Sequence, residues 1–408
     1  MANWKIYKLC EVANLSTGFP FDGHKYTKEG QRVVRGDNIT IGTLRWDADK
    51  DKRWNETFAR AKEFSLQAGD IVIGMDGSRV GRNRAQIKES DLPLLLAQRV
   101  ACIRHNSQTI QKFLYYQIFS NRFEDYIKSV HTGTSIPHVS LKQIGDFCFQ
   151  VPDLFIQQRI ANILSTLDDK IELNRRINEN LEQQAQALFK SWFVDFEPFK
   201  DGKFVDSELG MIPEGWKVNN IYEYIDVIYG APYKSSLFNT DKNGYPLIRI
   251  RDLKTYTPQF YTPEILPNTE YIYPGDVIAG MDAEFIPTLW LGEKGLLNQR
   301  CCKFISKRKN ISNYYLLYLL MPELLCVQNY KTGTTVSHLG KADIDRFKVI
   351  TPPIEIIEKF STLVNPLYNE KIKLACENRI ITNLRDALLP KLMSGELKLS
   401  EIETKLDE

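Results

Sequence analysis

The chain has 408 residues, which is long for one ordinary domain and predicts two or three. Hydrophobic residues make up 43% of it and charged residues 25%, a balance that argues against a wholly disordered protein. The net charge is only +2, but residues 1–150 hold 22 Lys and Arg against 16 Asp and Glu, a modest excess that fits either a polyanion partner or an ordinary solvated surface.

The first 153 residues have the pattern of a mixed α/β domain. Short β-branched runs at 33–41, 70–75 and 98–103 are broken by Gly, Asp and Asn, which is typical of strands and turns. A helical pattern follows at 110–130. We therefore predict that residues 1–153 form one domain with an irregular sheet.

A long helical pattern at 154–196 lies in a predicted spacer region, residues 154–200. Its apolar residues recur at alternating intervals of four and three, the spacing of a coiled-coil seam. The seam positions are Ile160, Leu164, Leu167, Ile171, Asn174, Asn178, Leu181, Ala185, Leu188 and Trp192. An asparagine in such a seam costs stability but fixes the register of the paired helices.

After a linker at 201–214, the chain repeats itself at 215–353. Three segments match in the same order: AGDIVIGMDG at 68–77 with PGDVIAGMDA at 274–283, LLAQR at 95–99 with LLNQR at 296–300, and HTGTSIPH at 131–138 with KTGTTVSH at 331–338. A period of about 200 residues indicates a duplicated domain, because solenoid repeats are roughly 20–50 residues long.

A second helical pattern at 354–397 carries the same heptads, and residues 398–408 form an acidic tail. Its seam positions are Phe360, Val364, Leu367, Lys371, Leu374, Asn378, Ile381, Arg385, Leu388 and Leu392. Pro366 should kink this helix and Pro390 should end or bend it, because proline lacks the backbone N–H. We expect the two long helices to pair as an antiparallel coiled coil with pseudo-twofold symmetry. The alternative is that each helix packs only on its own domain.

Polar and basic residues, most of them at matching places in the two copies, are the candidates for DNA contact. Arginine and glutamine can form paired hydrogen bonds with guanine and adenine edges, and threonine hydroxyls suit phosphates. The candidates are Arg35, Arg79, Arg82, Arg84, Gln98, Arg99, Thr132, Gly133, Thr134 and His138 in the first copy, and Arg249, Arg251, Gln299, Arg300, Thr332, Gly333, Thr334 and His338 in the second. The alternative is structural: ordinary turns at the TGT segments, and strand ends with packed or paired arginines.

Motifs of catalytic, cofactor and metal sites are missing from the sequence. There is no G-x-x-x-x-G-K-[ST] phosphate cradle, and the five histidines show no H-E-x-x-H or similar spacing. Seven cysteines without a C-x-x-C argue against a disulfide framework and a zinc site. No apolar run is long enough to span a membrane, and the start MANWK lacks the apolar segment of a secretory signal. We expect a non-catalytic, cytoplasmic protein that binds no cofactor or metal itself.

The helical segments resemble those of a known family. Residues 157–174, QQRIANILSTLDDKIELN, and LFKSWFVDF at 188–196 resemble the central helical region of type I restriction–modification specificity (S) subunits. LPKLMSGEL at 389–397 resembles the end of their C-terminal helix, and the GD strands and TGT segments resemble their two target recognition domains.

This resemblance implies two target recognition domains on an antiparallel helical spacer. It also implies assembly with two methyltransferase subunits, which bind S-adenosylmethionine, and with restriction subunits, which bind ATP and Mg²⁺. The chain would then read a bipartite, asymmetric target in double-stranded DNA, one half with residues 1–153 and the other with residues 215–353, mainly in the major groove. Two other hypotheses stay open: a coiled-coil scaffold whose domains bind protein, and an enzyme in its own right.

Overall fold

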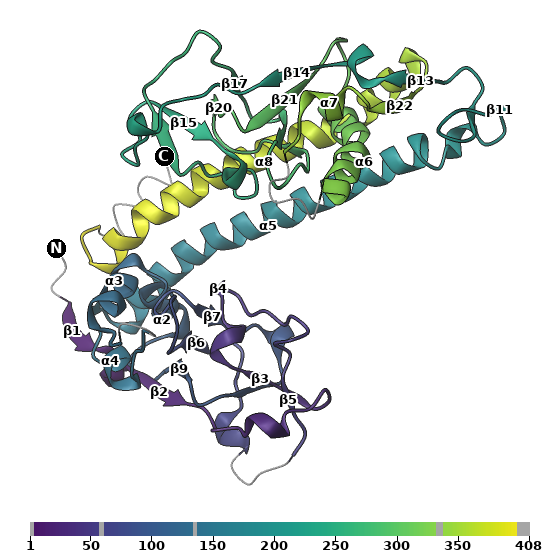
Figure 1. Cartoon of the computed structure of the whole chain (residues 1–408). Helices are drawn as coiled ribbons and strands as arrows, with labels where there is room; N and C mark the ends of the chain where they lie inside the picture. The colour runs from purple at the N-terminus through teal and green to yellow at the C-terminus, as the bar shows by residue number, and fades with distance from the viewer. Residues whose placement is uncertain (1–3, 57–60, 134–136, 332–337, 398–408) are drawn as a thin grey trace. The chain divides into compact units, whose positions relative to one another are not determined.

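The computed structural model describes residues 4–56, 61–133, 137–331 and 338–397 (Figure 1). The chain divides into two compact units, Met1–Asp169 with Thr382–Glu408, and Lys170–Ile381. Each unit combines a β-rich domain with parts of two long helices. Within the described residues, no helix is both long enough and apolar enough to cross a membrane.

The first unit holds a five-stranded sheet, ordered β2-β9-β6-β7-β4, and a three-stranded sheet, ordered β5-β3-β8. The strands are β2 (Ala13–Thr17), β3 (Gln31–Val34), β4 (Ile41–Gly42), β5 (Arg53–Trp54), β6 (Ile71–Gly74), β7 (Arg84–Gln86), β8 (Leu94–Leu96) and β9 (Val100–His105). A separate pair joins β1 (Lys5–Lys8) to β10 (Cys148–Val151). The short helices are α1 (Leu9–Val12), α2 (Gln111–Ile118), α3 (Asn121–Val130) and α4 (Leu141–Gly145).

The second unit repeats this order in two four-stranded sheets, β14-β21-β18-β19 and β16-β15-β20-β17. The strands are β14 (Ile225–Tyr229), β15 (Tyr245–Ile248), β16 (Phe260–Thr262), β17 (Tyr271–Ile272), β18 (Val277–Gly280), β19 (Thr288–Leu289), β20 (Gly295–Leu297) and β21 (Cys301–Ser306). Outside them lie β11 (Phe204–Val205), β12 (Ile212–Pro213), β13 (Lys217–Asn220), β22 (Lys348–Thr351), α6 (Asn313–Lys331) and α7 (Lys341–Ile344). The parallel pair β15–β20 corresponds to β3–β8, so the duplicated sequence folds into duplicated sheets.

Strands β6 and β18 lie inside their sheets and are buried on both faces, which explains their unbroken apolar runs. In β6, Ile71 and Ile73 belong to one core cluster and Val72 to another, as the alternation of side chains along a strand requires. In β18, Val277 and Ile278 divide in the same way.

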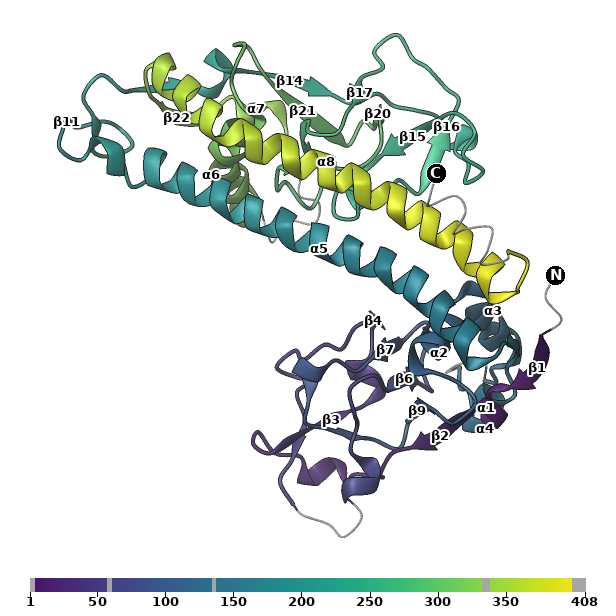
Figure 2. The same cartoon turned by 180° about the vertical axis from the view of Figure 1, so that it is seen from behind.

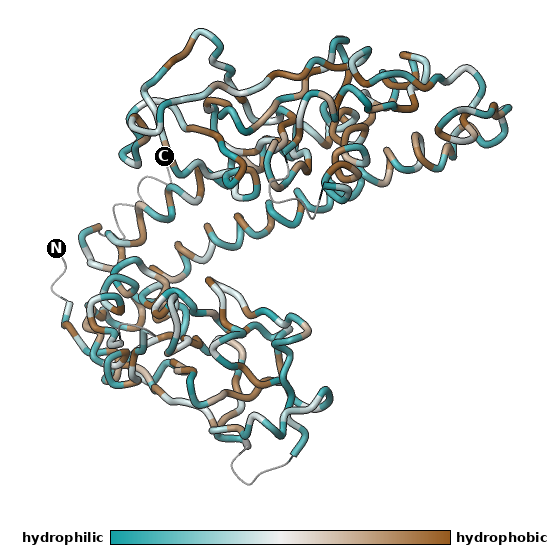
Figure 3. Tube along the Cα trace, in the orientation of Figure 1, coloured by the Kyte–Doolittle hydropathy of each residue, from teal (hydrophilic) through white to brown (hydrophobic). Residues whose placement is uncertain are grey.

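Two helices, α5 (Leu154–Phe193) and α8 (Ile354–Met393), are each continuous over 40 residues (Figures 1 and 2). Apolar and polar residues alternate along both (Figure 3). In the second unit they run antiparallel, because Asn174 Nδ2 donates to Asn378 Oδ1 at 2.9 Å while Lys371, earlier in α8, pairs with Glu182, later in α5.

All the predicted seam positions are buried or half-buried. Ile160 and Leu164 pack in the first unit's core with Leu388 at its edge, and Phe360 and Val364 lie in the second unit's core. Parts of the helices therefore pack into the domain cores, while polar contacts join the two helices in the second unit.

The structure refines two expectations about the helices. The pattern at 110–130 forms two helices, because Ser120 Oγ caps α3 by accepting from Phe123 N at 3.2 Å. Pro390 does not end α8, which continues to Met393; Gly395, with a φ of 67°, then leaves the helix.

Candidate nucleic-acid interface

Three segments distant in the sequence meet beyond the end of β6 in the first unit. Asp76 follows β6, Arg99 lies just before β9, and His138 lies between α3 and α4. Met75 N donates to Arg99 O at 3.2 Å, and Val139 N donates to Met75 O at 2.9 Å. These backbone bonds bring the three polar side chains to one place.

Asp76 lies at the centre of this group. His138 Nδ1 donates to Asp76 Oδ1 at 2.5 Å, the direction that an ionised carboxylate requires. Arg99 Nη1 lies 3.8 Å from Asp76 Oδ2, and the Arg99 side chain is 69% exposed. The carboxylate therefore holds both neighbours while the arginine stays open to a partner.

The second unit contains the same group. His338 Nδ1 donates to Asp282 Oδ1 at 2.7 Å, and Arg300 Nη1 lies 2.8 Å from Asp282 Oδ2. The Arg300 side chain is 67% exposed. The supporting backbone bonds recur as well, from Met281 N to Arg300 O at 2.8 Å and from Leu339 N to Met281 O at 2.7 Å. We name the two groups the Arg-Asp-His clusters.

The sequence candidates included the arginine and histidine of each cluster but missed Asp76 and Asp282. The available signal was the Met-Asp pair, which is identical in the two copies. A carboxylate repels phosphates and so does not by itself suggest DNA contact. Its role becomes visible only when three separate segments come together.

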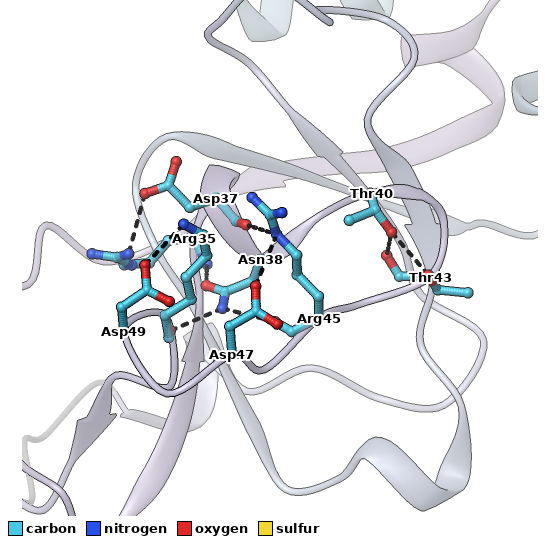
Figure 4. Close-up of polar contacts among 9 residues, drawn as sticks. Arg35, Asp37, Asn38, Thr40, Thr43, Arg45, Asp47 and Asp49 are labelled. Carbon is cyan, nitrogen blue, oxygen red and sulfur yellow. Dashed lines mark hydrogen bonds and ion pairs between the residues drawn. The ribbon is translucent and has the colours of Figure 1, made fainter. Parts of the chain in front are cut away.

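Arg35 and Arg249 follow equivalent parallel strands and begin equivalent 3-10 turns, η2 (Gly36–Asn38) and η8 (Ile250–Asp252). Arg35 N donates to Asn38 Oδ1 (Figure 4), and Arg249 N donates to Asp252 Oδ2, each at 3.0 Å. Asn38 is fully buried and also donates to Arg45 O at 3.2 Å. A buried side chain therefore fixes each turn, and in the first unit it also fixes the backbone at Arg45.

In the first unit the turn and the cluster border a pocket of about 420 Å³. The charged residues that line it are Arg35, Asp37, Arg45, Asp76, Arg79 and Arg99. Four guanidinium groups against two carboxylates leave an excess of positive charge, which favours an anionic partner.

Two arginines of the basic run at 79–84 are less available. Arg84 is 6% exposed, its Nη1 donates to Gly81 O at 2.5 Å, and burial lowers its pKa, so we remove it from the DNA-contacting set. Arg82 is exposed but pairs with Glu124 of α3 at 2.6 Å. Arg79 is exposed and forms no ion pair with any described residue.

The other candidates lie on the surface or outside the described residues. Gln98, Thr132, Gly133, Arg251 and Gln299 are exposed. Thr134, Thr332, Gly333 and Thr334 lie outside the part of the chain that the structure describes.

Three comparisons find the same kind of protein. A family model described as "Type I restriction modification DNA specificity domain" matches residues 1–183 and 213–381. The type I restriction enzyme MjaIX specificity subunit of Methanocaldococcus jannaschii is 30% identical, with 76% of this chain and 74% of that protein covered. The HindI specificity subunit of Haemophilus influenzae is 24% identical, with 97% and 100% covered. The crystal structure of a type I S subunit from M. genitalium covers 96% of both chains with a TM-score of 0.56 at 16% identity.

Proposed function

The chain belongs to the family of type I restriction–modification DNA specificity subunits, which are non-catalytic, and we propose that it reads a bipartite, asymmetric target in double-stranded DNA. Residues 1–153 read one half of the target and residues 215–353 read the other, each with the arginine of its Arg-Asp-His cluster against base edges. Arginine is suited to this task because its guanidinium can bond both O6 and N7 of guanine in the major groove.

The observation that carries the proposal is a shared cluster beside different loops. Arg99 and Arg300 are held by equivalent aspartates and are both mostly exposed. The next loop differs between the copies: where the first has the exposed Arg79, the second has Phe285, which is fully buried. Two readers of different sequences need a common framework and divergent contact loops.

Assembly extends the proposal to the rest of the system. The helical regions 154–200 and 354–397 set the spacing of the half-sites and dock two methyltransferase subunits, with restriction subunits joining for cleavage. S-adenosylmethionine belongs to the methyltransferase subunits, and ATP and Mg²⁺ to the restriction subunits. This chain supplies the sequence specificity.

The test is single-molecule methylation mapping in cells that supply the methyltransferase subunit, with this gene intact, deleted, or carrying Arg99→Ala or Arg300→Ala. We expect a two-part motif that disappears on deletion, with each substitution relaxing one half only. Absence of any bipartite motif in cells with the methyltransferase present would contradict the proposal. Duplex binding that does not weaken with salt would favour the protein-scaffold alternative, because phosphate contacts release counterions.

A further inference from the structure

The pocket of the first unit has the chemistry of a phosphate site. Its two carboxylates already have cationic partners, since Asp37 Oδ2 lies 3.2 Å from Arg35 Nη2 and Asp76 Oδ2 lies 3.8 Å from Arg99 Nη1. Arg79 and Arg45 bring further positive charge to the lining. The result is a concave, positively charged surface rather than a closed set of ion pairs.

The loop at one side of the pocket adds neutral donors. Val80 N donates to Gly77 O at 3.1 Å and closes a tight turn, in which Gly77 has a φ of 104°. The amides of Ser78 and Arg79, inside this turn, donate to no described residue, and both residues line the pocket. Free amides, a serine hydroxyl and guanidinium groups donate the kinds of hydrogen bond that DNA phosphates accept.

The corresponding place in the second unit is filled. Gly36, in the pocket lining, has nothing within 4 Å of the position of a Cβ, but its counterpart is Ile250. A Cβ at Gly280 would lie 3.1 Å from Ile250 Cγ2, whereas at the equivalent Gly74 the nearest atom of this turn is Gly36 Cα at 3.8 Å. The Ile250 side chain therefore occupies in the second domain a space that is open beside Gly36 in the first.

We propose that the pocket binds one phosphodiester group of the DNA backbone beside the half-site of the first domain. The volume would hold on the order of ten waters, so it has room for a phosphate with its flanking sugar oxygens. The inference rests on the proposed function, and it adds an asymmetry: the first domain supplies a salt-dependent backbone contact that the second does not.

The first test fills the pocket with the side chain that the second domain uses. Gly36→Ile in the full chain should reduce the slope of log K against log[salt] for a cognate duplex by about 0.9, the value for one phosphate, and weaken binding roughly tenfold. Gly23→Ile is the matched control, because Gly23 also begins a 3-10 turn, η1 (Gly23–Lys25), and has no atom within 4 Å of a Cβ. If Gly36→Ile disturbs folding, Arg79→Gln serves as the second variant, because Arg79 is exposed. It should reduce the salt slope and the affinity in the way expected for Gly36→Ile.

The second test changes the DNA instead of the protein, by neutralising one phosphate at a time. A series of cognate duplexes, each with one methylphosphonate, should reveal a position where the wild-type chain loses about tenfold in affinity and Gly36→Ile loses nothing further. An unchanged salt slope together with altered base preference would overturn the phosphate assignment and leave the proposed function standing. Saturation of the DNA-free chain by millimolar inorganic phosphate, with no sensitive duplex position, would assign the pocket to a free anion and also overturn it. If the wild-type chain shows no sequence-specific duplex binding, the proposed function itself fails.

Discussion

Asp76 and Asp282 hold the same position in the two domains, each accepting a hydrogen bond from a histidine and pairing with an exposed arginine. Around them the loops differ, since Glu284 pairs with Lys254 where the first domain has Ser78, which lines the pocket. The two domains therefore share the Arg-Asp-His cluster that positions an arginine, but they differ in the loops around it. Under the proposed function, this separation of positioning from contact would let one fold read two unlike half-sites.

Replacing Asp282 should weaken recognition of the second half-site and leave recognition of the first unchanged. In Asp282→Asn the amide has no charge to hold Arg300 and His338, so we expect roughly tenfold weaker binding and relaxed base preference in that half-site only. Competition binding with duplexes altered in one half at a time measures both effects. Asp241→Asn, an exposed aspartate of the same domain, is the control. Equal loss of preference in both halves would contradict a local positioning role.

Lys303 is a buried cation on which the second domain depends. It is 7% exposed, and its Nζ lies 2.9 Å from both Glu270 Oε1 and Asp276 Oδ2. Lys303→Met would leave two carboxylates without a counter-charge, and we expect a loss of about 3 kcal/mol in the free energy of unfolding, measured with urea. Lys254→Met removes an equally short pair, but Lys254 is 73% exposed, so its loss should stay below about 1 kcal/mol. Similar losses in the two variants would refute the importance of burial.

The same lysine predicts a dependence on alkaline pH. Burial acts to lower the pKa of Lys303, but its hydrogen bonds with Glu270 and Asp276 outweigh this and raise the pKa above the ordinary 10.5. A raised pKa means that the stabilisation is complete below pH 10.5 and is lost as the pH rises through the folded value. The stability difference between the wild type and Lys303→Met should therefore shrink above pH 10.5. The stability difference between Lys303→Arg and Lys303→Met should shrink less, because arginine stays charged. A difference between the wild type and Lys303→Met that stays constant above pH 10.5 would exclude the linkage.

The sequence predicts what depends on local pattern and fails where tertiary packing decides. The duplicated motifs predict duplicated strands, because matching positions of the repeat form β6 and β18, and heptad spacing predicts the two long helices. Arg79 and Arg84 look equivalent in the sequence, yet one is exposed in a turn and the other buried on β7 over the ring of Phe119. The role of Asp76 depends on backbone pairing between segments more than 20 residues apart, which no local pattern encodes.

A matched insertion in α5 and α8 should preserve the contacts that a single insertion breaks. Asn174 pairs with Asn378, and Glu182 pairs with Lys371, so a heptad added after Asn174 alone moves Glu182 about 10 Å away from its partner. A second heptad after Leu374 lies between Lys371 and Asn378 and restores both pairs, because the helices are antiparallel. We expect the single insertion to lower the free energy of unfolding and the double insertion to recover most of it. In methylation mapping, the doubly extended chain should keep both half-sites and recognise them across a longer spacer. An unchanged spacer in that stable variant would contradict the proposal that the helices set the distance.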